Sequence, residues 1–189
     1  MEQFLSSIER SLNEENWMSA VYMAICIPDI CGAAEEKIKN NGERYKNWFN
    51  RYLKWWYDPE NFYEQYKVLA PDSVNDLGEF MKSQYEARPA LVSFTAEECW
   101  ALRNACLHQG TDEAKLRNFR ITIPEFPGKK THFNNIKNVL QLDASTFCQD
   151  LIREARRWLS DTIDDPVVQK NLQKMMKINH SGFIFGSQS

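Results

Sequence analysis

The 189-residue sequence predicts an all-α fold, a helical bundle with one small β-hairpin-like excursion. Apolar residues recur at helical spacing in most segments, whereas strand-like alternation is confined to one stretch. A chain of this length can bury a sizeable core as one domain. We therefore expect a single helical domain over residues 1–177, the excursion over 116–142, and a C-terminal tail over 178–189.

The first forty residues predict three helical segments. The apolar residues of 4–12 share one helical face, and Asn16 is a candidate N-cap for a second helix. Pro28 kinks or restarts that helix. The apolar stripe then continues to Ile38, and Asn-Asn-Gly at 40–42 is a helix-stop signal.

The segment 45–57 is dense in aromatic side chains at nearly helical spacing, so a helix over Glu43–Tyr57 is expected. Lys46, Arg51 and Lys54 lie between the rings. The favoured interpretation is a stripe of core residues with a solvated opposite face. The alternative is an aromatic and basic surface on which nucleic-acid bases stack.

Two shorter helices are expected next, over 60–68 and from Val74 to Tyr85, separated by Pro71. The helix that follows has clear signals at both ends. Thr95 and Glu98 form a capping-box pattern at its start, and Gly110 is a stop signal after Gln109.

The excursion begins with alternation over residues 119–123, which is typical of a strand. Pro124, Pro127 and Gly128 indicate a turn region, and residues 139–142 are expected to form the returning strand.

Two helices are expected after the excursion. Asp143 or Ser145 caps a strongly amphipathic helix, and a last helix spans about Asp165–Met176.

The strongest functional signal is the cluster of Arg103, Asn104 and His108 on the predicted Thr95–Gln109 helix, in a chain with three His. Asn104 and His108 lie one turn apart on one face, and the long Arg103 side chain can bend toward them. Imidazole moves protons near neutral pH, and guanidinium binds phosphate oxygens bidentately. The cluster therefore predicts a site that handles phosphate.

Metal-free RNA cleavage is a reaction that suits such a site. It needs a base for the 2′-hydroxyl, positive charge for the phosphorane-like transition state, and an acid for the leaving 5′-oxygen. One copy of the cluster offers one imidazole, so a two-fold homodimer that brings two clusters together would supply both acid and base.

The pattern Arg103-Asn104-x-x-x-His108, near the end of a helix in a mostly helical domain, resembles the Arg-x4–6-His motif of the HEPN superfamily (higher eukaryotes and prokaryotes nucleotide-binding domain). The resemblance implies a dimerising helical bundle with a composite cleft. Many members are metal-independent endoribonucleases of toxin–antitoxin, abortive-infection or CRISPR-linked defence systems. By resemblance, Arg103, Asn104 and His108 are the catalytic set, no cofactor is needed, and RNA is the substrate.

Other residues are weaker candidates. Glu97 and Glu98 lie upstream on the same helix and are candidates for a supporting role. Arg153, Arg156 and Arg157 form either a solvated face or a surface that guides RNA toward the cleft.

The remaining His residues are less prominent. His132 and His180 are expected to be solvated. His108 itself has a structural alternative, as a partner of the helix dipole.

Net charge, cysteine content and the length of apolar runs limit the classes of protein to which the chain can belong. The net charge of −3 argues against non-specific nucleic-acid binding by overall field. Five scattered Cys suggest buried thiols in a reduced compartment, without ligand-like spacing for zinc. The apolar run Ala20–Ile30 is too short to span a bilayer and no signal peptide is evident, so a cytoplasmic protein with no membrane partner is expected.

Three functional interpretations remain open from the sequence. The first is a homodimeric ribonuclease of HEPN type. The second is a non-catalytic HEPN-like interaction or nucleotide-binding module, whose partner would be a cognate antitoxin or a nucleotidyltransferase. The third is an unrelated helical protein in which the motif arises by chance.

Overall fold

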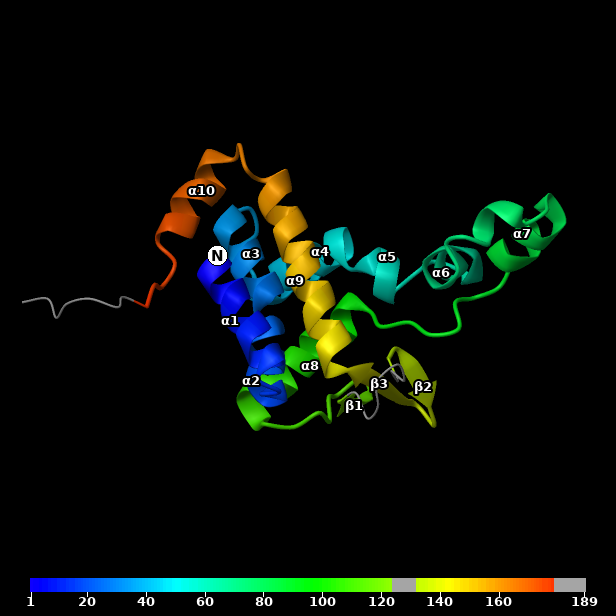
Figure 1. The fold of residues 1–189 in the computed structure, drawn as a ribbon, viewed down its shortest axis with the longest axis horizontal. Helices are drawn as coiled ribbons and strands as arrows, with labels where there is room; N and C mark the ends of the chain where they lie inside the picture. The colour runs from blue at the N-terminus through cyan, green and yellow to red at the C-terminus, as the bar shows by residue number, and fades with distance from the viewer. Residues whose placement is uncertain (124–131, 179–189) are drawn as a thin grey trace, which may run out of the picture.

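The computed structural model describes residues 1–123 and 132–178, which form a mostly helical fold with one small sheet (Figure 1). The first half contains α1 (Glu2–Asn13), α2 (Trp17–Ala24), α3 (Ile27–Glu35), α4 (Asn41–Tyr52), α5 (Lys54–Tyr57), α6 (Phe62–Leu69), the 3-10 turn η1 (Val74–Asp76) and α7 (Glu79–Glu86). The second half contains α8 (Ala96–Gln109), β1 (Asn118–Thr122), β2 (Asn134–Ile136), β3 (Val139–Asp143), α9 (Ala144–Asp161) and α10 (Pro166–Gln173). The predicted helical character is confirmed.

The hydrophobic core lies among α1, α2, α3, α4, α8 and α9. Helix α3 packs against α4, α9 and α10, while α2 packs against α1 and α9, and α4 packs against α8. The largest completely buried side chains are aromatic: Trp48, Trp158, Tyr45, Tyr57, Phe49, Phe94 and Phe147. Most of the aromatic segment 45–57 therefore lies in the core, as the favoured interpretation held. Trp55 is the exception, with 45% of its surface exposed.

The helix boundaries between α3 and α4 differ from the prediction. Helix α3 ends at Glu35 because Glu36 adopts a left-handed conformation with φ of 54°, so Ile38 lies outside the helix. The Asn40 side chain accepts a hydrogen bond from the N–H of Glu43 (3.1 Å) and caps the start of α4. The 40–42 signal was therefore wrongly interpreted as a stop. Gly42 lets α4 start close to Trp100, because a Cβ at this position would lie 3.3 Å from the Trp100 ring.

The sheet corrects the predicted hairpin over 116–142. Strands form at both predicted stretches, 119–123 and 139–142, but β1 pairs with β3 in parallel, with Phe119 opposite Leu140. The hairpin is made instead by β2 and β3, through a turn in which Lys137 and Asn138 have φ of 50° and 64°. Two consecutive positive φ values are typical of a type I′ turn. The predicted turn residues Pro124, Pro127 and Gly128 lie outside the described residues.

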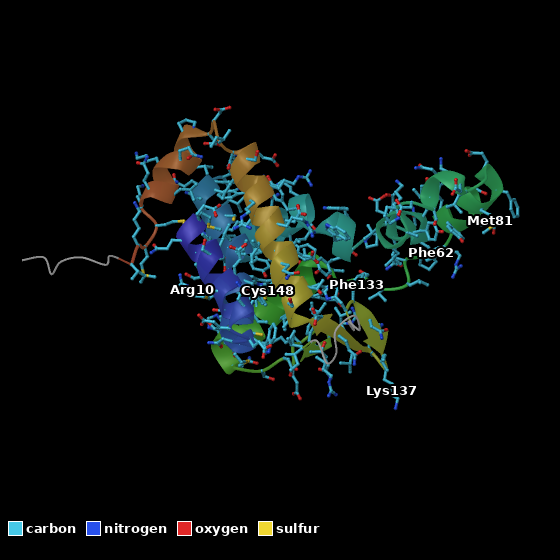
Figure 2. All side chains as sticks on the ribbon, viewed as in Figure 1. Arg10, Phe62, Met81, Phe133, Lys137 and Cys148 are labelled. Atoms are coloured by element: carbon cyan, nitrogen blue, oxygen red, sulfur yellow. The ribbon has the colours of Figure 1, made fainter. Side chains whose placement is uncertain are left out.

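Helices α6 and α7 project from the bundle as an arm (Figure 1). The arm has its own ring cluster of Phe62, Tyr66 and Tyr85, with centroids 4.8–6.1 Å apart. Figure 2 shows Phe62 and Met81 at two positions along it. Where the arm rejoins the core, the backbone N–H of Phe94 donates to the carbonyl oxygen of Tyr57 at 2.6 Å. The arm thus leaves and re-enters the fold at one point.

Candidate functional site

Helix α8 carries the Arg103 cluster and begins and ends where the sequence predicts. The Thr95 hydroxyl accepts from the N–H of Glu98 (3.2 Å), and the Glu98 carboxylate accepts from the N–H of Thr95 (2.9 Å). This completes the capping box. Gly110 ends the helix with φ of 67°, a left-handed conformation that suits glycine. The cluster therefore lies on the last turns of a continuous helix.

The structure brings the three predicted site residues together. One terminal nitrogen of the Arg103 guanidinium donates to Asn104 Oδ1 at 3.1 Å and lies 3.3 Å from His108 Nε2. The guanidinium also lies 5.0 Å from the centre of the Trp100 ring, a cation–π contact. His108 is exposed, whereas Asn104 and Arg103 are half-buried. The cluster thus faces solvent at its imidazole end.

The hydrogen-bond roles in the contact between Arg103 and His108 follow from the chemistry of the guanidinium. Guanidinium has donors and no acceptor, so His108 Nε2 must be the acceptor. An imidazole that accepts at Nε2 is neutral and carries its proton on Nδ1. A general base requires the Nε2 lone pair, which here accepts from Arg103 and becomes available only when that contact is released.

Asp29 on α3 holds Arg103 from the core side, and the sequence analysis missed it. One Asp29 oxygen lies 2.7 Å from the second terminal nitrogen of Arg103, and the other lies 3.7 Å from Arg44. Neither oxygen has a hydrogen-bond partner in the described structure, so the attraction is mainly electrostatic. A carboxylate in an apolar helix is the sequence signal that could have revealed it, because such a charge needs a partner.

A cavity of about 480 Å³ opens beside the cluster. Its wall includes Asn104 and His108 of the cluster, together with Trp100, Gln109 and Lys115. The volume falls in the range typical of small-ligand sites. A phosphate group with part of a nucleotide is therefore of a size that this cavity can admit.

The two upstream glutamates have different surroundings. Glu97 lines the cavity and binds Lys46 at 2.6 Å. Glu98 is occupied by the capping box and by an ion pair with Arg117 at 3.4 Å. Glu97 is thus the one of the two that faces the site, while Glu98 stabilises the start of α8.

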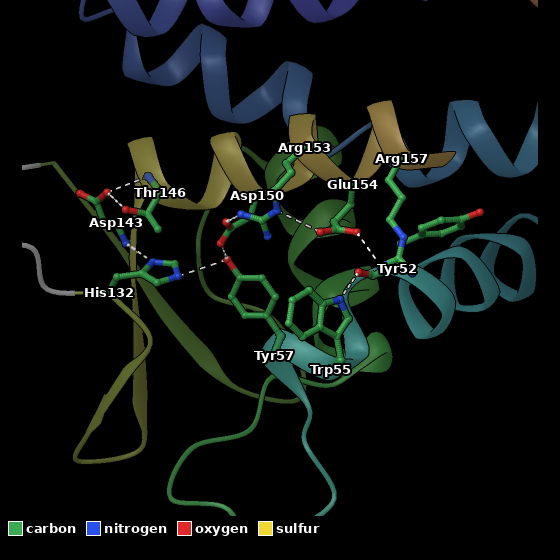
Figure 3. Close-up of polar contacts among 10 residues, drawn as sticks. All are labelled: Tyr52, Trp55, Tyr57, His132, Asp143, Thr146, Asp150, Arg153, Glu154 and Arg157. Atoms are coloured by element: carbon green, nitrogen blue, oxygen red, sulfur yellow. Dashed lines mark hydrogen bonds and ion pairs between the residues drawn. The ribbon is translucent and has the colours of Figure 1, made fainter. Parts of the chain in front are cut away.

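The three predicted guiding arginines on α9 are each paired with carboxylates. Arg153 contacts Asp150 (2.6 Å) and Glu154 (3.0 Å), and Arg157 lies 3.7 Å from Glu154 (Figure 3). Arg156 forms ion pairs with two residues of α1, Glu9 (2.7 Å) and Glu2 (3.6 Å). These pairs offset the positive charge that would attract RNA, which favours the interpretation of a solvated face.

Two other routes to catalysis near the Arg103 cluster would be a metal site and a cysteine nucleophile. In the described part of the chain, no group of three or more His, Cys, Asp or Glu residues is placed to hold a metal ion. Cys106 lies on α8 between Arg103 and His108, and burial raises the pKa of its thiol to about 11. The thiol is therefore protonated at neutral pH and a poor nucleophile.

One described stretch, Trp17–Glu35, is long and apolar enough to cross a membrane, with a mean hydropathy of 1.4. It is longer than the Ala20–Ile30 run that the sequence analysis singled out. Of its most apolar window, 56% is buried, and it consists of α2 and α3, which pack against α1, α4, α9 and α10. This burial is typical of core helices in a soluble domain, and the cytoplasmic location stays a prediction.

No family model, no curated protein and no solved structure matches the chain. The resemblance to the HEPN superfamily therefore stays a hypothesis that depends on the Arg103 cluster and its helical surroundings. Function has to be inferred from the geometry of α8 and its neighbours.

Proposed function

We propose that this protein is a metal-independent endoribonuclease of HEPN type that works as a homodimer. The observation that carries the proposal is the 3.3 Å contact between the Arg103 guanidinium and Nε2 of the exposed His108, beside a cavity large enough for a nucleotide. The contact places a fixed positive charge next to a neutral imidazole. These are the charge and the base that cleavage at a 2′-hydroxyl requires.

In the proposed reaction, a phosphate oxygen of RNA replaces His108 Nε2 as the acceptor of the Arg103 N–H. The freed Nε2 takes the proton from the 2′-hydroxyl, whose oxygen then attacks the adjacent phosphorus. Arg103 stabilises the charge on the phosphorane-like transition state, and Asn104 orients the guanidinium. The 5′-oxygen leaves with a proton from a second imidazole, and the product ends in a 2′,3′-cyclic phosphate.

The second imidazole comes from a second copy of the chain in this proposal. Each chain contributes one α8, and a two-fold axis near the two His108 side chains would create a composite cleft. We therefore expect a homodimer at micromolar concentration. Analytical ultracentrifugation that shows only monomer, with or without RNA, would remove the composite site.

A second candidate is a non-catalytic HEPN-like interaction or nucleotide-binding module, with an antitoxin or a nucleotidyltransferase as partner. The ion pair between Arg103 and the buried Asp29 favours it, because an arginine tied to the core at 2.7 Å also fits a structural role. In that case RNA or a nucleotide binds without being cleaved.

Cleavage of a labelled RNA in the presence of a chelator separates the two candidates. The ribonuclease proposal predicts cyclic-phosphate products, retained activity without divalent ions, and loss of cleavage by His108→Ala. His180→Ala is the matched control and should cut normally. A 2′-deoxyribose at the scissile position should block cleavage. Tight RNA binding without cleavage would favour the second candidate.

A further inference from the structure

A second cavity, of about 450 Å³, lies between the end of α5, α6, α9 and the irregular segment before α8. Among the described residues, none lines both this cavity and the one beside His108. Its apolar wall is formed by Trp56, Val68, Leu69, Leu91, Val92 and Phe133. The volume and the apolar wall are typical of sites that bind small organic molecules.

A directed chain of hydrogen bonds forms the polar end of this cavity (Figure 3). The backbone N–H of Asp143 donates to His132 Nδ1 at 3.2 Å, so Nδ1 carries no proton. His132 Nε2 therefore carries it and donates to the Tyr57 hydroxyl at 3.2 Å. Tyr57 donates in turn to Asp150 Oδ2 at 2.7 Å. His132 is thus half-buried and hydrogen-bonded within the fold, where solvation alone was expected.

The polar end carries little net charge. The tautomer of His132 is neutral. Burial and the neighbouring Asp150 raise the pKa of Tyr57 well above its usual value, so its hydroxyl stays protonated. The Asp150 carboxylate is offset by Arg153, 2.6 Å from Oδ1. A neutral ligand therefore matches this cavity better than an ion does.

The hydrogen bonds still open at the cavity define what the ligand must offer. Tyr57 and His132 already donate their protons within the hydrogen-bond chain. The Gln65 side-chain amide is also occupied, because it is hydrogen-bonded to the backbone of Leu91 and Val92. Asp150 accepts two hydrogen bonds in the described structure, while a carboxylate can accept about four. The spare capacity therefore calls for a donor on the ligand.

The Trp56 indole adds a hydrogen-bond donor to the acceptor that Asp150 provides. Its indole N–H is buried and has no hydrogen-bond partner in the described structure. Arg153 lies 4.8 Å from the centre of the Trp56 ring and also binds Asp150, and both Trp56 and Asp150 line the cavity. A hydroxyl group can donate to the carboxylate and accept from the indole, whereas an ether oxygen can only accept.

We propose that this cavity, between Trp56 and the Tyr57–Asp150 pair, binds a small neutral aromatic molecule with a phenolic hydroxyl. The apolar wall receives the ring, and Asp150 receives the hydroxyl proton. The site does not depend on the proposed ribonuclease activity, because it shares no residue with the Arg103 cluster. It gives the fold a place to bind a phenolic compound apart from any RNA.

Calorimetric titration with 2-naphthol tests the proposal, and 2-methoxynaphthalene is the matched ligand with the same rings and no donor. We expect 2-naphthol to bind with a Kd on the order of 100 µM to 1 mM, as its size allows. The methoxy compound should bind at least tenfold more weakly, since it leaves Asp150 without the added hydrogen bond. Equal affinity for the two compounds would overturn the assigned ligand class.

Cavity-filling variants locate the site. Val92→Phe should abolish 2-naphthol binding, while Ala101→Phe, which fills the cavity beside His108, should leave the affinity unchanged. Leu91→Trp is a second cavity-filling variant, at a position that is 58% exposed. It replaces Val92→Phe in the binding assay if that variant does not fold. Unchanged binding by a folded filling variant, or no heat of binding by the wild-type protein, would overturn the proposal.

Discussion

The carboxylate of Asp29 on α3 lies 2.7 Å from the guanidinium of Arg103 on α8. The same guanidinium reaches Asn104 and His108 through its other terminal nitrogen. Asp29 therefore fixes the orientation of the fork that contacts Asn104 and His108. Arg103 is both a core ion-pair partner and a member of the proposed site, and the two roles can be separated by measuring stability and cleavage together.

Asp29→Asn should slow RNA cleavage at least tenfold and lower the free energy of unfolding by about 2 kcal/mol, because a charged contact is lost at a largely buried position. Asp72→Asn, at an exposed position of the arm, is the matched control and should change neither quantity. Cleavage assays and urea unfolding measure the two effects. Normal cleavage by a destabilised Asp29→Asn protein would show that Asp29 only stabilises the fold.

Arg103→Lys should keep the charge and lose the activity. A lysine presents one compact ammonium group, whereas the planar fork contacts Asp29, Asn104 and His108 together. Loss of a transition-state donor costs on the order of 3 kcal/mol, which corresponds to a rate at least a hundredfold lower. Single-turnover cleavage measures this rate. A variant that cuts RNA at the wild-type rate would show that only the charge matters.

Thr95→Ala should destabilise the protein by about 1 kcal/mol, because the start of α8 loses its side-chain cap. Cleavage by the folded variant should stay close to the wild-type rate, since the Arg103 cluster lies at the other end of the helix. Ser6→Ala, at an exposed position of α1, is the control and should not lower stability. Urea unfolding followed by circular dichroism gives the comparison.

Stability should fall as the pH rises above about 10, the ordinary pKa of tyrosine in an unfolded chain. Burial raises the pKa of Tyr52 to about 12 and that of Tyr57 further above its usual value. Above pH 10 the unfolded chain therefore releases protons that the folded protein keeps, so alkali favours unfolding. Urea midpoints at several alkaline pH values measure the slope, and Tyr52→Phe should reduce it. A slope unchanged by Tyr52→Phe would contradict the assignment.

Local signals in the sequence predicted local structure well. The capping pattern at Thr95 and the glycine after Gln109 placed both ends of α8, because caps depend on residues only a few positions apart. Alternation likewise located β1, and the expected returning strand over 139–142 matches β3. Asn40 shows the limit of such signals, because asparagine is common both where helices end and where they start, and here it starts α4.

Partners that are distant in the chain could not be predicted in this way. The pairing of Asp29 with Arg103 joins two helices that come together only in the folded bundle. Arg156 is neutralised by Glu9 of α1 for the same reason. The parallel pairing of β1 with β3 also depends on the path of the chain between them, about which alternation carries no information.

The hydrogen bond from Phe94 to Tyr57 makes the arm of α6 and α7 an insertion with adjacent ends. The entropy of closing a loop changes only slowly with its length, so lengthening or shortening this insertion disturbs the bundle little as long as its two ends stay joined. Evolution can therefore alter the arm, residue by residue or as a whole, without moving α8. The fold thus separates the bundle that holds α8 from an arm whose length can change.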